Sequence, residues 1–401
     1  MTVQHTASES AGRRWALVAS SVAACAQAAA CAAMPALRET TPPHLLDAAL
    51  PWRPEVRLTL DAMLAAQHAR CGSPAPVAVL DWDNTVAKND VGDALFFWML
   101  RHDKVRRPAG GDWGLTSRYL TPAARGRLAQ VCGGAGETVP TSTGTACADE
   151  LLSLYLDQRT TDGQPAFTGY HPRRMQPAYA WLAQLIAGYT ADEVRAFASA
   201  AIDEGLGAPV GATQTVGSRG GLPGYLRLYD QMKDLIGVLG DAGFDVWIVS
   251  ASPQAAVEAF AARAGVSAGR VIGIRTQRDA RGRYTHELSG CGPAAAGDDA
   301  VITYGAGKRC WMNKVVFGAD GADALERASE PGRRPVFAAG DSDSDGEMLS
   351  DAAVRLVIDR GAHGLACLAR LGVNDHWLVH PMFIDPLPAD RPPPACPALP
   401  R

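Results

Sequence analysis

Three short apolar runs that end in polar residues constrain the fold of this chain more than any other feature. Residues 77–80, 246–249 and 336–339 are apolar throughout, and a cluster rich in Asp or Ser follows each run. A continuous apolar run suits a strand that is buried on both faces, as in a parallel sheet. Helical patterns alternate with strand patterns from residue 229 onward, and this alternation predicts a doubly wound parallel α/β sheet. The polar clusters should therefore meet at the carboxyl edge of the sheet, where such folds place their active sites.

The domain organisation follows from a change of pattern inside this sheet. Residues 93–224 carry helical patterns, and residues 217–224 contain four glycines that suggest a flexible exit. We interpret residues 93–224 as an all-helical insertion, or cap. The α/β core then comprises residues 75–92 and 225–385, and residues 386–401 form a Pro-rich tail that we expect to be disordered.

The first 34 residues have the order of a targeting segment. Two arginines precede a short apolar run at residues 15–24, and small residues follow. That order is typical of a secretory signal, so we expect export to the periplasm or the cell exterior. The segment also resembles a lipoprotein signal, in which Cys25 would be acylated and anchor the protein to a membrane. The alternatives are a membrane-spanning helix, for which the segment is weakly hydrophobic, and an Ala-rich cytosolic helix. Residues 35–74 should form a Pro-rich linker followed by one helix.

Composition bounds the partners of the chain. The 401 residues are 47% hydrophobic and carry a formal net charge of −4. A generic polyanion binder needs a basic face, so we expect no nucleic-acid partner. A small anionic substrate remains compatible, because a local site can be positive in an acidic protein. The sequence leaves the oligomeric state open.

The nine cysteines show no zinc-ligand spacing. Cys132 and Cys147 bracket one loop and are the best candidates for a disulfide, followed by Cys291 and Cys310 around another loop. In a cytosolic protein these residues would instead be small buried apolar side chains.

The polar clusters contain the residue types that phosphoryl transfer needs. A nucleophile attacks phosphorus in line, while a divalent cation offsets the repulsion between two anions. Asp81 would attack and form an aspartyl-phosphate. Asp83 would protonate the leaving alkoxide and later deprotonate water. Lys308 would neutralise charge between nucleophile and phosphate, and Ser250 would donate a hydrogen bond to a phosphoryl oxygen.

Mg²⁺ is the expected cofactor, because it prefers carboxylate, carbonyl and water oxygens. Asp81 and Asp341 would supply side chains, and Asp83 its backbone carbonyl. Each element alone has an ordinary explanation: an Asp-x-Asp pair is usually a solvated loop, and Asp345 would serve as a helix cap. Their occurrence together, in this order along the chain, is hard to explain by structure alone.

In these residues the chain resembles the haloacid-dehalogenase-type phosphohydrolase superfamily, whose four motifs it matches in order. The motifs are Asp-x-Asp-x-Thr, a strand-end Ser, a Lys and Gly-Asp-x-x-x-Asp, here Asp81, Asp83, Thr85, Ser250, Lys308, Gly340, Asp341 and Asp345. The resemblance covers residues 75–360 and implies a Rossmann-like sheet with an inserted cap. It also implies a Mg²⁺ site at Asp81, Asp83, Asp341 and Asp345, and phosphate contacts from Thr85, Ser250, Ala251 and Lys308.

Two residues near the nucleophile narrow the reaction class that the resemblance implies. Family members that dehalogenate carbon lack the second aspartate, so Asp83 favours phosphate esters. The ion-pumping branch carries a Lys directly after the nucleophile, where this chain has Trp82. Residues 246–253 and the Gly-Lys pair at 307–308 look most like the phosphoserine-phosphatase-type subgroup.

The substrate is indicated by fewer residues. The phosphoserine enzymes place a Glu nine residues after the nucleophile to hold the substrate amine, and this chain has Asp90 there. Asp93 and the aromatic residues 96–98 follow. An acidic residue beside aromatic faces holds an ammonium group well, and an exported protein with such a pocket would be similar to the bacterial phosphorylcholine phosphatases. The alternative is that residues 96–98 belong to a helix core.

The sequence therefore predicts an exported Mg²⁺-dependent phosphomonoesterase that acts through an aspartyl-phosphate. Its substrate would be a small phosphorylated metabolite, with an amine-bearing one such as phosphorylcholine or phosphoserine favoured by Asp90. A phosphotransferase of the same fold is one alternative, because closure of the cap decides whether water or an alcohol accepts the phosphoryl group. A catalytically inactive exported binding protein is the other, against which the four intact motifs argue.

Overall fold

The computed structural model describes residues 44–68, 74–293, 301–372, 376–388, 390–392 and 395–396. The expected targeting segment at residues 1–34, with the candidate lipid attachment at Cys25, lies outside the described residues. The helix expected after the linker is α2 (Pro54–His68). No helix in the described ranges has both the length and the apolar character that crossing a bilayer requires.

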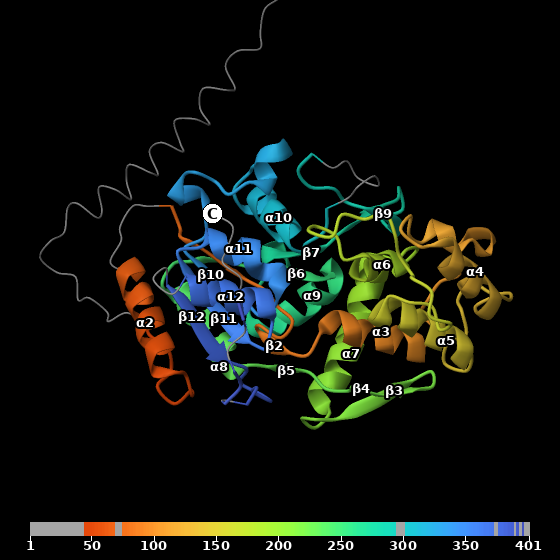
Figure 1. Ribbon diagram of the computed structural model, residues 1–401, viewed down its shortest axis with the longest axis horizontal. Coiled ribbons are helices and arrows are strands. Elements are labelled where there is room, and N and C mark those ends of the chain that lie inside the picture. Colours follow the sequence, from red (N-terminus) through yellow and green to blue (C-terminus); the bar gives the residue numbers. More distant parts are fainter. Residues whose placement is uncertain are drawn as a thin grey trace, which may run out of the picture.

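A six-stranded parallel sheet forms the centre of the core, with the strand order β12-β11-β10-β1-β6-β7 (Figure 1). Its strands are β1 (Val77–Leu80), β6 (Asp245–Pro253), β7 (Val271–Ile274), β10 (Phe337–Gly340), β11 (Val354–Asp359) and β12 (Trp377–Pro381). From β1 the chain builds outward through β6 and β7 on one side, and through β10 to β12 on the other. The order therefore reverses between β1 and β10, which is where open α/β sheets bind ligands. The predicted doubly wound parallel sheet is confirmed.

The alternation of side chains along each strand gives the sheet two buried faces. Ala78 and Leu80 of β1 point into a core shared with α2, α8 (Asp230–Asp241) and α9 (Gln254–Ala261). Val79 between them points into a second core on the opposite face. The helices that cover this face are α10 (Ala306–Val316), α11 (Gly346–Asp351) and α12 (His363–Leu371). Burial on both faces explains why the run at 77–80 is apolar without interruption.

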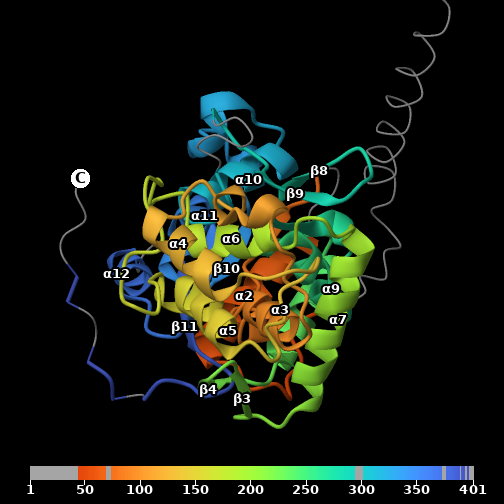
Figure 2. The same cartoon turned by 90° about the vertical axis from the view of Figure 1, so that its right-hand side faces the viewer.

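The cap is built between two short strands that pair with each other. β2 (Ala87–Lys88) leads into it, and β5 (Arg227–Leu228) leads out of it and pairs antiparallel with β2. Its helices are α3 (Val91–Arg101), α4 (Pro122–Val131), α5 (Thr145–Leu152), a π-helical turn (Ser153–Asp157), α6 (Pro177–Leu185) and α7 (Ala191–Gly207). Most of them pack around a third hydrophobic core that includes Phe97, Trp113 and Trp181. Figure 2 faces this side of the molecule.

The expectation that residues 93–224 are wholly helical is wrong at their C-terminal end. Residues there form an antiparallel hairpin of β3 (Thr213–Val216) and β4 (Arg219–Pro223). Gly217 makes the turn with a φ of 58°, a left-handed conformation that suits glycine. The Asp149 carboxylate of α5 then accepts hydrogen bonds from the backbone and the hydroxyl of Ser218, both at 2.7 Å. Gly217 therefore belongs to an anchored turn, and Gly220 and Gly221 lie in strand β4, in place of the expected flexible exit. A second hairpin, β8 (Thr276–Arg278) with β9 (Tyr284–Leu288), agrees with the sequence pattern.

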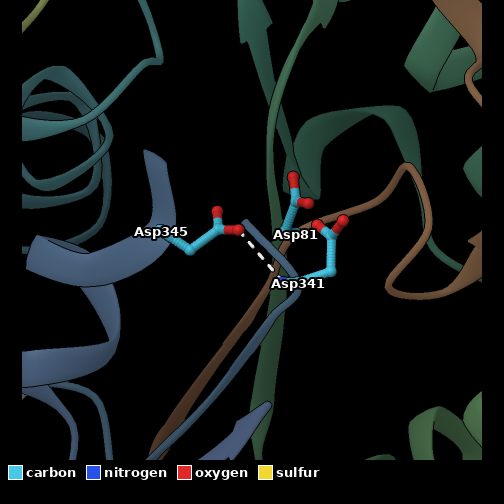
Figure 3. Close-up of side chains that lie close together, drawn as sticks. All are labelled: Asp81, Asp341 and Asp345. Carbon is cyan, nitrogen blue, oxygen red and sulfur yellow. Dashed lines mark hydrogen bonds between the residues drawn. The ribbon is translucent and has the colours of Figure 1, made fainter. Parts of the chain in front are cut away.

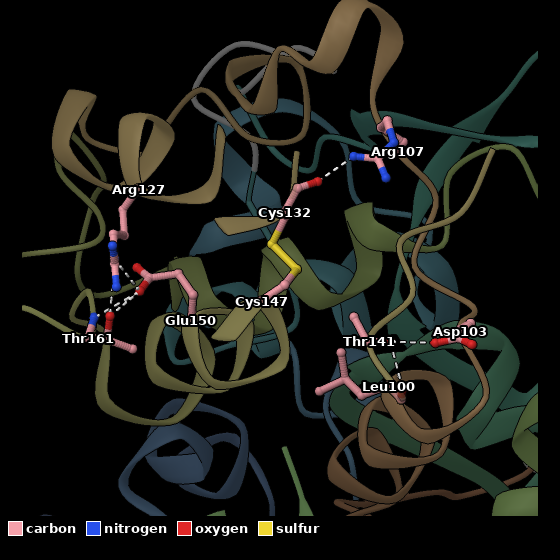
Figure 4. Close-up of a disulfide and its surroundings, with 9 residues drawn as sticks. All are labelled: Leu100, Asp103, Arg107, Arg127, Cys132, Thr141, Cys147, Glu150 and Thr161. Carbon is pink, nitrogen blue, oxygen red and sulfur yellow. Dashed lines mark hydrogen bonds and ion pairs between the residues drawn. A yellow bond between two sulfur atoms is a disulfide. The ribbon is translucent and has the colours of Figure 1, made fainter. Parts of the chain in front are cut away.

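Two expected disulfides are present, and a third was not anticipated. Cys132–Cys147 joins the end of α4 to α5 inside the cap (Figure 4), and Cys291–Cys310 joins the chain after β9 to α10. The third joins Cys367 of α12 to Cys396 in the C-terminal tail. An ion pair between Arg391 and Asp359 holds the same tail against the end of β11 at 3.2 Å. The expectation of a disordered tail is therefore wrong for its described residues.

Candidate active site

The first motif follows β1 through a tight loop. The backbone N–H of Asp81 still donates to the carbonyl of Ala339 on β10, at 2.9 Å, so Asp81 sits at the end of the pairing between β1 and β10. The chain then turns at Asn84, whose φ of 58° is a conformation that Asn tolerates better than most residues. Asp81 is 5% exposed. The loop thus presents a buried carboxylate at the topological switch point.

The fourth motif lies beside it at the end of β10. One carboxylate oxygen of Asp345 accepts hydrogen bonds from the N–H groups of Asp341 (3.1 Å) and Ser342 (2.9 Å), and from the Ser342 hydroxyl (3.0 Å). Figure 3 shows the Asp345 side chain directed at the backbone of Asp341. Gly340 permits this approach, because a Cβ there would lie 2.6 Å from the Cβ of Asp345. Asp345 therefore fixes the strand end that carries Asp341.

Lys308 joins the two motifs. Its ammonium lies 2.6 Å from Asp81 Oδ1 and 2.5 Å from Asp345 Oδ1. Burial, the largest influence, disfavours the charge, but the carboxylates of Asp345 and Asp81 prevail and raise the pKa of Lys308. The side chain is 1% exposed, so its charge is fixed in place beside the Asp81 carboxylate.

A cation fits the carboxylates at this strand edge. One oxygen each of Asp81, Asp341 and Asp345 lies within 4.8 Å of the others, and all three residues are buried. Burial first, and then the charge of Asp81, raise the pKa of Asp341 well above its usual range. Asp341 Oδ2 is buried and has no hydrogen bond among the described residues, although the Arg360 guanidinium forms an ion pair with it. Oxygen ligands with excess negative charge suit a hard divalent ion. Both oxygens of Asp345 already accept bonds, which suits orientation of the site better than direct ligation.

Asp83 lines the pocket, and both oxygens of its carboxyl group accept hydrogen bonds from the protein. Its Oδ1 accepts from the N–H of Val91 at 2.7 Å. Its Oδ2 accepts from the hydroxyls of Ser252 at 2.7 Å and of Ser250 at 3.2 Å. Burial first, and then the charges of Asp90 and Asp81, raise the pKa of Asp83 well above its usual range. A raised pKa suits a carboxyl group that must carry a proton near neutral pH.

A cavity of about 640 Å³ opens above these groups and extends to the cap. Asp81, Asp83, Ala251 and Lys308 line its floor. Thr85 and Ser250 do not line it. The Thr85 hydroxyl is buried 3.2 Å from both Asp81 Oδ2 and Asp341 Oδ1.

The far end of the cavity is acidic and aromatic. Asp90, Asp93, Tyr155 and Tyr179 line it. Asp90 caps α3 by accepting from the N–H of Asp93 at 3.0 Å, and the Tyr155 hydroxyl donates to Asp93 at 2.8 Å. Burial first, and then the charge of Asp90, raise the pKa of Asp93 to about 8. An organic cation between these two carboxyl groups would favour their charged forms, which burial otherwise disfavours.

Sequence reasoning found one side of this cavity and missed the other. The four motifs meet as expected, and Asp90 lies at the far end. Sequence reasoning named Asp93 after Asp90 without giving it a role of its own, and it missed Ser252, Tyr155, Tyr179 and Arg360. Ser252 and Asp93 are close in sequence to motif residues, which is a usable signal, whereas the two tyrosines come from cap elements with no such neighbour. The alternative interpretation of residues 96–98 holds for the first two: Phe96 and Phe97 are buried in the cap core.

Comparison with known proteins gives one family and one fold. The model of a haloacid dehalogenase-like hydrolase family matches residues 148–350, half of the chain. No curated protein sequence matches significantly.

Solved structures resemble the chain at low sequence identity. A conserved protein of unknown function from Anaerococcus prevotii DSM 20548 is 17% identical, with a TM-score of 0.55 over 84% of this chain and 94% of that one. A Bordetella pertussis Tohama I protein of unknown function is 15% identical, with a TM-score of 0.45 over 78% and 100% of the two chains. A phosphoserine phosphohydrolase-like protein from Francisella tularensis subsp. tularensis SCHU S4 is 14% identical, with a TM-score of 0.35 over 76% and 94%. Only the first of these likenesses is strong enough to bear on the fold.

Proposed function

Because the chain belongs to the haloacid dehalogenase-like hydrolase family, we propose that it is a Mg²⁺-dependent phosphomonoesterase. The observation that carries the proposal is the buried Asp81 carboxylate, held 2.6 Å from the Lys308 ammonium at the switch point of the sheet. A second carboxyl, Asp83, lines the same cavity two residues later. Nucleophile, charge neutraliser and proton donor are thus within reach of one phosphate ester.

The reaction proceeds in two displacements. An Asp81 oxygen bonds to phosphorus while the bond from phosphorus to the alkoxy oxygen breaks, and Asp83 gives its proton to that oxygen. Water then attacks the phosphorus of the aspartyl-phosphate, Asp83 takes back a proton, and Asp81 leaves as a carboxylate. The products are an alcohol and orthophosphate. Lys308 stays charged throughout and stabilises the negative charge around phosphorus.

Asp81, Asp341 and the carbonyl of Asp83 would hold Mg²⁺, which would offset the repulsion between nucleophile and phosphate. Asp345 would orient the Asp341 backbone and Lys308, in keeping with its hydrogen bonds. Thr85 would fix the carboxylates of Asp81 and Asp341 from behind.

The far end of the cavity favours an amine-bearing substrate. Asp90 and Asp93 supply carboxyl groups that a bound cation would convert to their charged form, while Tyr155 and Tyr179 supply aromatic faces. An ammonium or quaternary ammonium group placed there would neutralise carboxyl groups that burial penalises. Phosphorylcholine and related phosphorylated amino alcohols match a site with a phosphate end and a cation end.

The Asp81→Asn variant tests the chemistry. It should lose Mg²⁺-dependent release of phosphate from an aryl phosphate and still unfold at a temperature near that of the wild type. Asn313→Ala, in the buried part of α10 away from the cavity, is a matched control for nonspecific damage. A wild-type protein that releases no phosphate from any substrate with Mg²⁺ present would refute the proposal.

A substrate panel tests the cation end. We expect phosphorylcholine and phosphoethanolamine to be hydrolysed with higher kcat/KM than a sugar phosphate of similar size. Asp93→Asn should reduce that preference and leave the rate on an aryl phosphate nearly unchanged. Equal kcat/KM on all substrates of the wild type would contradict the assignment.

Export from the cytosol completes the proposal. Three disulfides among the described residues support it, because such bonds persist in oxidising compartments. A lipid anchor at Cys25 remains part of the proposal.

A further inference from the structure

Ser252 makes the shortest side-chain contact to the proposed proton donor. The Ser252 hydroxyl donates to Asp83 Oδ2 at 2.7 Å, half an ångström closer than the hydroxyl of the motif residue Ser250. Ser252 is 4% exposed, lies at the end of β6 and does not line the cavity. It therefore holds the Asp83 carboxyl from the side that faces away from the cavity.

The hydrogen bonds around Asp83 are distributed unequally between its two carboxyl oxygens. The N–H of Ser252 donates to the hydroxyl oxygen of Ser250 at 3.2 Å, which directs the Ser250 proton toward Asp83 Oδ2. Both hydroxyls thus converge on one oxygen and fill its two lone pairs. Oδ1 accepts a single bond, from the N–H of Val91. Oδ1 is consequently the oxygen left with a lone pair on which a transferable proton can reside.

The surrounding backbone leaves room for this contact. A Cβ at Gly92 would lie 3.0 Å from the Ser252 hydroxyl oxygen and 3.0 Å from Asp90 Oδ1. Ser252 also lies 3.4 Å from Asp90 Oδ1, so one hydroxyl touches the proton donor and the carboxyl at the cation end. A serine with a purely local structural role at the end of β6 would not need a hydroxyl that contacts both of these carboxyl groups.

We propose that Ser252 is a positioning residue for proton transfer, which holds the Asp83 carboxyl so that Oδ1 delivers its proton to the leaving alkoxide. The inference rests on the proposed phosphomonoesterase function. Asp83 Oδ1 loses a proton as the bond from phosphorus to the alkoxy oxygen breaks, and the alcohol leaves neutral. Ser252 itself exchanges no proton with the substrate.

The test exploits the dependence of general acid catalysis on the leaving group. p-Nitrophenolate leaves without a proton, whereas an alkoxide needs one. At saturating Mg²⁺, Ser252→Ala should lower kcat/KM for an alkyl phosphate by about tenfold or more, and for p-nitrophenyl phosphate by about twofold at most. A series of aryl phosphates should show a steeper dependence of kcat/KM on leaving-group pKa than in the wild type. Ser252→Thr keeps the hydroxyl and should restore the wild-type dependence.

Thr303→Val is the matched control, because the buried Thr303 hydroxyl donates to the carbonyl of Ser250 at 2.5 Å and does not touch Asp83. It should lower both rates by the same factor, as a merely structural change would. Equal losses on alkyl and aryl phosphates in Ser252→Ala would overturn the role of Ser252 while the phosphatase proposal stands. A wild-type protein inactive on every phosphate ester would overturn both.

Discussion

The stability of the Mg²⁺-free protein should fall as the pH rises, and Asp93 provides the sharpest test. Its pKa is raised from 3.8 to about 8, by burial first and then by the charge of Asp90. Between these values the folded protein holds one proton at Asp93 that the unfolded chain has lost. The unfolded state therefore binds fewer protons, so the free energy of unfolding decreases with rising pH across this window.

The size of the effect can be worked out from the same two pKa values. One proton is worth ~1.4 kcal/mol per pH unit, and the slope halves at the folded pKa, so the loss from pH 6 to pH 8 would be about 2 kcal/mol. Asp93 keeps part of its surface open to the cavity, and screening by water reduces the expected loss to about 1–2 kcal/mol. Asp93→Asn should abolish this part of the pH dependence.

Urea unfolding at pH 6 and pH 8, in the presence of a chelator, measures this pH-dependent difference in the free energy of unfolding. Tyr155→Phe is the control, because it removes the hydrogen bond that lowers the pKa of Asp93 and keeps the carboxyl. It should retain the pH dependence and extend it to higher pH. Parallel stability curves for the wild type and Asp93→Asn would refute the reasoning. Choline at pH 8 should restore stability to the wild type more than to Asp93→Asn, since the ammonium would replace the missing proton.

Three further predictions concern the rest of the molecule. Lys308→Met should abolish phosphate release and destabilise the protein by about 3–5 kcal/mol, because two buried carboxylates lose their cation; unchanged denaturant midpoints would contradict the burial argument. Reducing Cys132–Cys147, or replacing both residues by Ser, should cost about 3 kcal/mol for a 15-residue separation, seen as a lower melting temperature, and a melting temperature equal to that of the wild type would argue against it. Mass spectrometry should find the mature N-terminus downstream of the targeting segment, with a diacylglyceryl group if Cys25 is the anchor; an intact terminus at Met1 in the cytosol would end the export proposal.

The strand edge could be predicted from the sequence for a topological reason. Parallel strands bring their carboxyl ends to one edge whatever their separation along the chain, so Asp81 and Asp341 must meet once their strands are adjacent. The same reasoning places Ser250 beside them. No assumption about side-chain packing is needed for these positions.

The cap side could not be predicted, because its contacts depend on how helices dock. Tyr155 reaches Asp93 across 62 residues of sequence, and neither residue carries a local signal for the other. The Cys367–Cys396 disulfide was missed because a Pro-rich tail resembles a disordered segment until it is seen against α12. The β3–β4 hairpin was missed for a related reason, since its turn depends on Asp149 from another element.

The π-helical turn at Ser153–Asp157 carries Tyr155 in the cavity wall, so a deletion of one residue there would reposition that wall. Such a turn holds one residue more than an α-helical turn. Deleting one residue there would let the helix return to α-helical register and rotate the next residues by roughly 100° about the helix axis. Tyr155 would then leave Asp93, while the strand edge that carries Asp81, the proposed nucleophile, would be untouched. If the proposed function holds, a single-codon deletion is thus a route by which this scaffold could change its substrate class without altering the proposed catalytic residues.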